Sequence, residues 1–189
     1  MRVALFGGTF DPPHIGHWLA AVDTFEALRL DRLVFVPAAR QPLKQHRETA
    51  PAVTRAAMVR AMTEGDPRFA MDPIELERPG LSYTVDTLEA YRARADVTEL
   101  FFVMGADALA SFDRWKAPER VRQLATLVVL RRDADVVDLP AGVDALVLRS
   151  RRVDVSSTEI RARVRGGLSI RGFVPAAVEA YLTASGLYR

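Results

Sequence analysis

Short runs of apolar residues alternate along the chain with longer segments of mixed polarity. The apolar runs cover residues 2–6, 33–36, 69–71, 99–104, 127–130 and 145–148, and they predict buried β-strands. Helical periodicity or capping signals predict helices over 18–25, 50–64, 85–94, 156–167 and 174–182. Strands that alternate with helices are typical of parallel sheets with right-handed crossovers. The pattern therefore predicts a Rossmann-like, doubly wound α/β fold, with a mostly parallel sheet, helices on both faces and a small C-terminal helical part.

Composition narrows the class of protein. With 189 residues, 49% of them hydrophobic, the chain is long enough for a single domain spanning residues 1–189. The absence of cysteine excludes disulfides and thiolate metal sites. No apolar run approaches the ~18 residues of a membrane helix, and the first predicted strand begins without a signal-peptide pattern. We therefore expect a cytoplasmic protein with no membrane partner.

Charge says less about the partner. The formal net charge is +2 and the sequence pI is about 9.3. This mildly basic balance suits a polyanionic small molecule and does not require nucleic acid, so no nucleic-acid partner is expected. The sequence leaves the formation of a homo-oligomer open.

The most informative segment is GGTFDPPHIGH, residues 7–17. Gly7 and Gly8 follow the first predicted strand, and a predicted helix comes directly afterwards. Glycines allow a close backbone approach that a side chain would forbid. A helix start presents unpaired N–H groups and a partial positive charge. A strand, a glycine turn and a helix start in this order predict a site for an anion, most often a phosphate.

Two of the three histidines in the chain, His14 and His17, lie in this segment. Their spacing of three residues places them on the same face of a helical turn. One interpretation is that they cap or pack the helix start. A second is a metal pair, but zinc sites usually need three or four ligands and no further cluster is evident. The third, which we favour, is a pair of imidazole donors beside a bound phosphate.

A second phosphate motif is VSSTEIR, residues 155–161. Ser156 and Glu159 have the spacing of a capping box, which predicts a helix start and fully explains these two residues. It does not explain Ser157, Thr158 and Arg161. Hydroxyl groups at a helix N-terminus, with a guanidinium one turn further on, are equipped to bind a polyphosphate.

Four other residues are candidates for binding. Gly105 and Asp107 follow the predicted strand 99–104, at the sheet edge where open α/β folds bind ligands. Asp107 can accept hydrogen bonds from ribose hydroxyls or cap the next helix, which we expect to end around residues 112–115. Trp115 can stack on an aromatic ring or pack in the core. Thr84 is a plausible N-cap of the helix 85–94.

The segment 8–17 resembles the signature of the nucleotidyltransferases that carry the T/HxGH motif. That superfamily includes nicotinate-nucleotide, phosphopantetheine and glycerol-phosphate nucleotidyltransferases, and it is related to class I aminoacyl-tRNA synthetases. Residues 75–88 closely match nicotinate-nucleotide adenylyltransferases and not the other members. The resemblance covers residues 1–189 through five separate motifs.

The resemblance implies an enzyme that transfers the adenylyl group of ATP to nicotinate mononucleotide in NAD biosynthesis. The substrate 5′-phosphate would attack the α-phosphorus in line and release pyrophosphate. Mg²⁺ would accompany ATP, bound largely by phosphates and water rather than by a protein metal site. Catalysis would then consist of positioning the phosphates and stabilising their charge.

The resemblance also implies residue roles. The catalytic residues would be His14, His17 and Arg161. ATP and its phosphates would contact Gly7, Gly8, Thr9, Phe10, Lys44, Gly105, Asp107, Arg132, Ser156, Ser157 and Thr158. The nicotinate nucleotide would contact Thr84, Trp115 and Lys116, with Trp115 stacked on the pyridine ring. The histidine that the family carries before the basic residue at Lys44 is replaced by Leu43, so its role is absent here.

Two other functions remain open. One is a different adenylyltransferase of the superfamily, acting on phosphopantetheine or on nicotinamide mononucleotide. The phosphopantetheine enzymes would share both phosphate motifs but lack the 83–88 and Trp115 regions. The other is a non-catalytic nucleotide sensor on the same scaffold, against which the intact His14, His17 and Arg161 argue.

Overall fold

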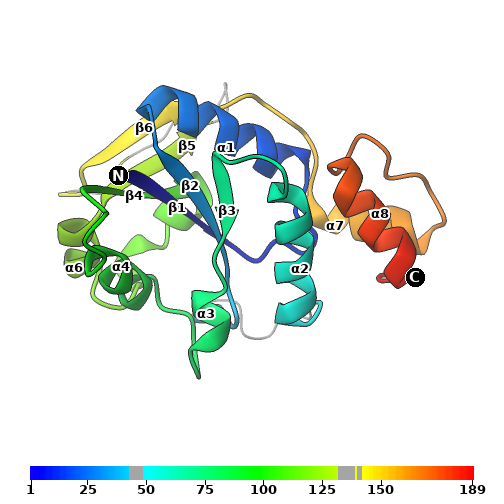
Figure 1. Cartoon of the computed structure of the whole chain (residues 1–189), viewed down its shortest axis with the longest axis horizontal. Coiled ribbons are helices and arrows are strands. Elements are labelled where there is room, and N and C mark those ends of the chain that lie inside the picture. Colours follow the sequence, from blue (N-terminus) through cyan, green and yellow to red (C-terminus); the bar gives the residue numbers. More distant parts are fainter. Residues whose placement is uncertain (43–48, 132–138, 140–141) are drawn as a thin grey trace.

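The computed structural model describes residues 1–42, 49–131, 139 and 142–189. Six strands of this part of the chain form one sheet, in the order β3-β2-β1-β4-β5-β6 (Figure 1). They are β1 (Arg2–Gly8), β2 (Arg32–Pro37), β3 (Phe69–Met71), β4 (Glu99–Gly105), β5 (Thr126–Arg131) and β6 (Ala145–Arg149). Every pairing is parallel. The predicted Rossmann-like α/β fold is confirmed, with a sheet that is parallel throughout these strands.

The strand order places a switch point beside β1. The chain adds β2 and β3 on one side of β1, and then β4, β5 and β6 on the other. The connections that leave β1 and β4 therefore diverge at the carboxyl ends of these two strands. In open parallel sheets the crevice for a ligand forms at this point.

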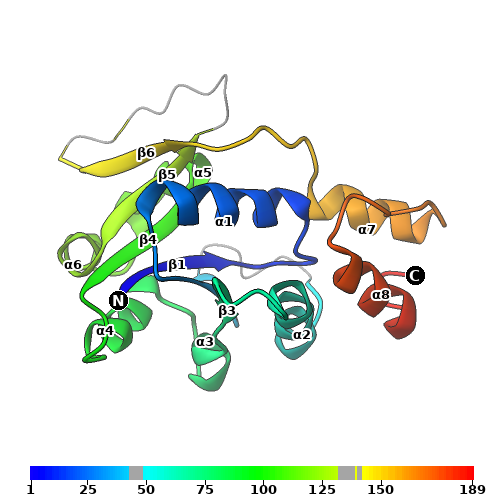
Figure 2. The same ribbon diagram turned by 45° about the horizontal axis from the view of Figure 1, so that its top comes forward.

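Helices cover both faces of the sheet. Side chains alternate along β1, so that Ala4 and Phe6 face one side while Val3 and Leu5 face the other. The first side packs against α1 (Ile15–Leu28) and α2 (Ala52–Thr63), and the second against α4 (Thr84–Arg92) and α6 (Pro118–Leu124). Figure 2 shows α1 and α4 on opposite sides of the strands. Burial on both faces explains why β1, β2 and β4 are continuously apolar. The prediction of a buried strand over 145–148 is wrong as to burial, because β6 is an edge strand in which Leu146 is 43% and Val147 40% exposed.

Several boundaries differ from those predicted. The N-cap of α4 is Tyr83, whereas Thr84 is its first helical residue, so the prediction of a Thr84 cap is wrong. The helix expected after Gly105 is divided into α5 (Ala106–Leu109) and a 3₁₀ turn over Phe112–Arg114. There the buried Phe112 packs into the core on the α4 side. The short helices α3 (Ile74–Glu77) and α6 were not predicted.

The C-terminal part lies beyond the carboxyl end of β1. It consists of α7 (Ser157–Arg165) and α8 (Ala176–Ser185), which are close together in both views (Figures 1 and 2). Ile160 of α7 and Val178 of α8 are fully buried in the same core cluster as α1 and α2. The helices of the described ranges include none that is long and apolar enough to cross a bilayer.

Candidate active site

A cleft of about 520 Å³ opens at the carboxyl ends of β1 and β4. Most of the predicted site residues line it, although they come from four separate regions of the sequence. They are Gly7, Gly8, Thr9, Phe10, His17, Thr84, Gly105, Asp107, Trp115, Lys116, Ser157 and Arg161. Ser156, the N-cap of α7, and Thr158 of α7 are exposed, whereas Lys44 and Arg132 lie outside the described residues. The fold therefore brings both phosphate motifs to one cavity.

The turn after β1 requires glycine at position 8. A Cβ on Gly8 would come within 2.7 Å of the Phe10 ring, which is closer than real side chains approach. Phe10 has φ 51° and is only 2% exposed, so the chain turns sharply there and buries the ring under the turn. The ring packs edge-on against His17, at 5.1 Å between centroids. Phe10 thus supports His17, and its predicted contact with ATP stays a prediction.

The two histidines lie at the start of α1, where His14 is the N-cap. Their ring centroids are 3.7 Å apart, so the predicted proximity is confirmed. The backbone N–H of His14 donates to Nδ1 of His17 at 3.2 Å. Because Nδ1 accepts this bond, a neutral His17 carries its proton on Nε2. His17 lines the cleft and can donate from Nε2, whereas His14 is 9% exposed and stacks against it.

The N-terminus of α7 is docked onto the glycine-turn segment. The predicted cap is confirmed, since Ser156 Oγ accepts from the N–H of Glu159 at 3.1 Å. Ser157 Oγ donates to the carbonyl of Pro12 at 2.8 Å, and Nη1 of Arg161 donates to the carbonyl of Asp11 at 2.7 Å. Because these contacts tie α7 to the β1–α1 connection, Arg161 and His17 face the same cleft.

A buried arginine that was not predicted holds the cleft wall together. Arg55 of α2 is 2% exposed, and its guanidinium donates to backbone carbonyls at 2.7–3.2 Å. The acceptors are Thr9, Ala38, Ala39 and Ala50. Burial lowers the pKa of Arg55, and the negative charge of Asp11 partly opposes this effect. The sequence around Arg55 does not indicate that its side chain is buried or that it binds backbone carbonyls.

The α4 side of the cleft combines an aromatic ring with a helix N-terminus. Trp115 is half-buried and packs against Phe102 and Phe112, at 5.8 and 5.3 Å between centroids, while still lining the cleft. Thr84 begins α4, where the first N–H groups lack intrahelical acceptors. Nζ of Lys116 lies 2.9 Å from Asp86 and is thus already paired with a carboxylate. Its predicted contact with the nicotinate nucleotide stays a prediction.

Glu75 of α3 is a cleft residue that sequence analysis missed. It is 9% exposed and its Oε1 accepts from Thr87 Oγ1 at 2.9 Å. Burial raises the pKa of this carboxyl, and hydrogen bonds from Thr87 and Ser82 oppose the rise. A four-residue helix has no periodicity that would mark such a side chain.

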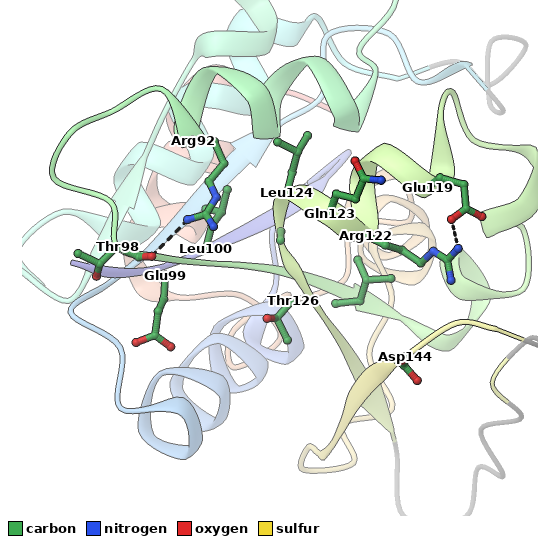
Figure 3. Close-up of a pocket in the computed structure, with 12 residues that line it drawn as sticks. Arg92, Thr98, Glu99, Leu100, Glu119, Arg122, Gln123, Leu124, Thr126 and Asp144 are labelled. Atoms are coloured by element: carbon green, nitrogen blue, oxygen red, sulfur yellow. Dashed lines mark hydrogen bonds and ion pairs between the residues drawn. The ribbon is translucent and has the colours of Figure 1, made fainter.

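A second cavity of about 470 Å³ lies at the opposite edge of the sheet, at the start of β4 and β5 (Figure 3). None of the predicted site residues lines it. Both of its arginines already contact other groups of the protein, since Arg122 pairs with Glu119 and Arg92 donates to the carbonyl of Thr98. Ligands of parallel α/β sheets bind at the carboxyl ends of the strands, which favours the first cleft as the functional site.

The fold and the paired phosphate motifs together define a nucleotidyltransferase, and residues 5–163 match the Cytidylyltransferase-like family. A protein of Gemmatimonas aurantiaca named "Probable nicotinate-nucleotide adenylyltransferase" is 51% identical, over 100% of this chain and 93% of its own. A protein of the same name from Thermus thermophilus is 47% identical over the whole of both chains. The chain belongs to the nicotinate-nucleotide adenylyltransferase family.

Solved structures agree on the fold. The Plasmodium falciparum nicotinic acid mononucleotide adenylyltransferase, solved in complex with NaAD, matches with a TM-score of 0.77. The match covers 99% of this chain and 97% of that chain. At 15% sequence identity it shows a shared architecture only.

Proposed function

We propose that the cleft binds ATP and nicotinate mononucleotide together and transfers the adenylyl group from one to the other. The products are nicotinate adenine dinucleotide and pyrophosphate. The observation that carries this proposal is the convergence of His17, from the β1–α1 connection, and Arg161, from α7, on one cleft. An anion between them meets a helix N-terminus, an imidazole donor and a guanidinium.

The reaction needs no nucleophile from the protein, because the 5′-phosphate of nicotinate mononucleotide attacks the α-phosphorus of ATP. We assign His14, the Nε2–H of His17 and the turn at Thr9 to the α-phosphoryl group. The His14 ring also packs against the His17 ring. Arg161 is assigned to the leaving pyrophosphate. The Ser157 hydroxyl donates to Pro12, so its backbone N–H is the group offered to the phosphates. Positioning and charge stabilisation then account for the catalysis.

We expect Mg²⁺ to enter this site as a partner of ATP. Within the ranges that the structure describes, no three His, Asp or Glu side chains come together as a metal site. A magnesium ion would be held mainly by the phosphates and by water, as is usual for Mg²⁺, and would neutralise charge on the triphosphate.

The remaining assignments concern the two nucleosides. We assign Gly105 and Asp107, at the end of β4, to the adenosine. Thr84 and Trp115 are assigned to the nicotinate ring. The cytoplasmic location and the single domain stay predictions. The formation of a homo-oligomer stays open.

Pyrophosphate release from MgATP tests the proposed reaction. The enzyme is supplied in parallel with nicotinate mononucleotide, nicotinamide mononucleotide or phosphopantetheine. We expect nicotinate mononucleotide to give the highest kcat/KM. Release with phosphopantetheine alone would assign the enzyme to another branch of the superfamily, and ATP binding without release would identify a nucleotide sensor.

Arg161→Lys is expected to lower kcat/KM for ATP. The guanidinium donates to the Asp11 carbonyl through Nη1 and to Thr158 Oγ1 through Nη2, and an ammonium cannot keep both contacts and still reach a phosphate. The loss is expected to be roughly 10- to 100-fold, since a hydrogen bond to a charged group contributes about 1.5–3 kcal/mol. Steady-state kinetics with varied ATP measures it.

The matched control for this variant is Arg165→Lys, an exposed arginine on the same helix. Its kinetics and the melting temperatures of both variants should remain near those of the unmodified enzyme. Equal kcat/KM values for the two variants would contradict the role of Arg161.

Thr84→Val is expected to narrow the preference for the acid over the amide. The Thr84 hydroxyl and the N–H groups at the start of α4 are donors that a carboxylate satisfies. An amide instead turns its NH₂ group toward one of them. Leaving one such donor unpaired costs ~1–3 kcal/mol, which corresponds to roughly 5- to 150-fold discrimination.

Trp115→Ala is the matched comparison, because stacking serves the acid and the amide alike. It should weaken both substrates together and leave the ratio of their kcat/KM values unchanged. The measurement is the set of kcat/KM values for both mononucleotides with each variant. Loss of selectivity in Trp115→Ala alone would reverse the two assignments.

A further inference from the structure

We propose that Tyr188, next to the last residue of the chain, is a positioning residue that orients Arg161 for ATP binding through the buried carboxylate of Asp11. The inference rests on the proposed place of Arg161 at the ATP phosphates. It adds the C-terminal tail to the residues on which the site depends.

Asp11 belongs to the first phosphate motif, contacts Arg161 of the second, and is 4% exposed. Its Oδ1 accepts from the Tyr188 hydroxyl at 2.6 Å and from the backbone N–H of Ala50 at 3.2 Å. Its Oδ2 accepts no hydrogen bond within the described residues and lies 3.6 Å from Nη1 of Arg161. Two donors on one oxygen fix the rotation of the carboxylate, which directs the other oxygen toward the guanidinium.

Arg161 depends on this arrangement for its own orientation. Its side chain is 14% exposed, and Nη1 contacts both the carbonyl and the carboxylate of Asp11. The negative charge of Asp11 also acts on the buried Arg55, so Arg161 is not the sole cation that attracts this carboxylate. The Tyr188 bond, opposite Arg161 on the carboxylate, favours the rotation in which Oδ2 faces Arg161.

The backbone conformation at Tyr188 accompanies the hydrogen bond of its hydroxyl to Asp11. Tyr188 has φ 68°, the left-handed region that residues with a side chain rarely adopt. Such a conformation persists only where the surroundings hold it. Burial, together with the bond to Asp11, raises the pKa of Tyr188, so its hydroxyl remains protonated and can donate throughout the physiological range. The bond joins residues that are 177 positions apart.

Calorimetric titration with MgATP tests the inference without a second substrate. Tyr188→Phe keeps the ring and removes only the donor. We expect its Kd for ATP to rise about 3- to 10-fold, the range for one hydrogen bond. Tyr181→Phe, a partly buried tyrosine on α8, is the matched control and should retain the unmodified affinity.

A double variant distinguishes positioning from a general loss of structure. If Tyr188 acts through Arg161, then Tyr188→Phe combined with Arg161→Lys should bind ATP no more weakly than Arg161→Lys alone. Additive losses, or equal affinities for Tyr188→Phe and Tyr181→Phe, would overturn the inference.

Asp11→Asn provides a second route if the Tyr188 variant fails to fold. Its carbonyl oxygen can still accept from Tyr188, but the amide nitrogen then faces Arg161, so ATP affinity should fall at least as far. Unchanged affinity in this variant would also overturn the inference. If the unmodified enzyme binds ATP but does not use nicotinate mononucleotide, the proposed reaction is contradicted. The comparison of ATP affinities among the variants still tests the role of Tyr188.

Discussion

His17→Ala is expected to lower kcat by about 10²-fold or more, the range found when one donor to a developing oxyanion is removed. Its Nδ1 accepts the backbone N–H of His14, so Nε2 is the ring nitrogen that carries the proton in a side chain that lines the cleft. The charge on the α-phosphoryl group changes as the bond to pyrophosphate breaks. A donor at that position therefore contributes more in the transition state than in the bound substrates. Single-turnover measurements at saturating ATP would isolate this step.

The same substitution also removes a helix-capping contact, and stability must be followed separately. Loss of a cap costs typically ~1 kcal/mol, which is too little to unfold an ordinary domain. Glu26→Ala, an exposed change near the end of the same helix, is the matched control and should retain its kcat. If the His17 variant retained near-normal kcat, the assignment of the imidazole to the reacting phosphate would be wrong.

Arg55→Met is expected to cause the largest loss of stability among the substitutions considered. The guanidinium is buried, and its removal leaves the carbonyls of Thr9 and Ala38 without their donors at 2.7 Å. It also leaves Asp11 with one cation fewer. Breaking a buried charged group away from its partners costs about 3–5 kcal/mol. A chain of this size should then melt roughly 10 °C lower, as thermal denaturation would measure.

Arg60→Met is the control for Arg55, because Arg60 is an exposed arginine in the last turn of the same helix. Its effect should remain within about 1 kcal/mol, the scale of a charge at a helix C-terminus. Activity gives a second distinction. Since Arg55 ties the turn at Thr9 to the neighbouring loop, its variant should lose affinity for ATP below its melting temperature. Similar melting temperatures for the two variants would show that the buried contacts contribute little.

Local chemistry explains why both phosphate motifs were predictable. In the first motif the contacts form between residues that are close in the chain. The turn needs glycine at position 8, where a Cβ would meet the Phe10 ring, and the helix start brings the rings of His14 and His17 together. The Ser156 cap is equally local, since its hydroxyl accepts from an N–H three residues ahead. Interactions of this kind depend on backbone geometry that the neighbouring residue types restrict directly.

The interactions that join the two motifs are not local. Asp11 is part of a recognisable segment, yet its partners Ala50, Arg161 and Tyr188 lie 39, 150 and 177 positions away. The burial of Arg55 and of Glu75 likewise depends on elements distant in the chain. The periodicity and residue spacing of the sequence do not predict these contacts, because they form only when the sheet and its flanking helices pack.

The environment of the Trp115 side chain could not be predicted from the sequence and is defined by the tertiary structure. From the sequence alone came the α/β class, the two helix starts that carry the predicted phosphate motifs, and the presence of an aromatic residue after β4. It left core packing and ligand stacking as alternatives for that residue. The packed structure places Trp115 against Phe102 and Phe112 while it still lines the cleft. A side chain's exposure depends on every element that covers it, and only the tertiary fold brings those elements together.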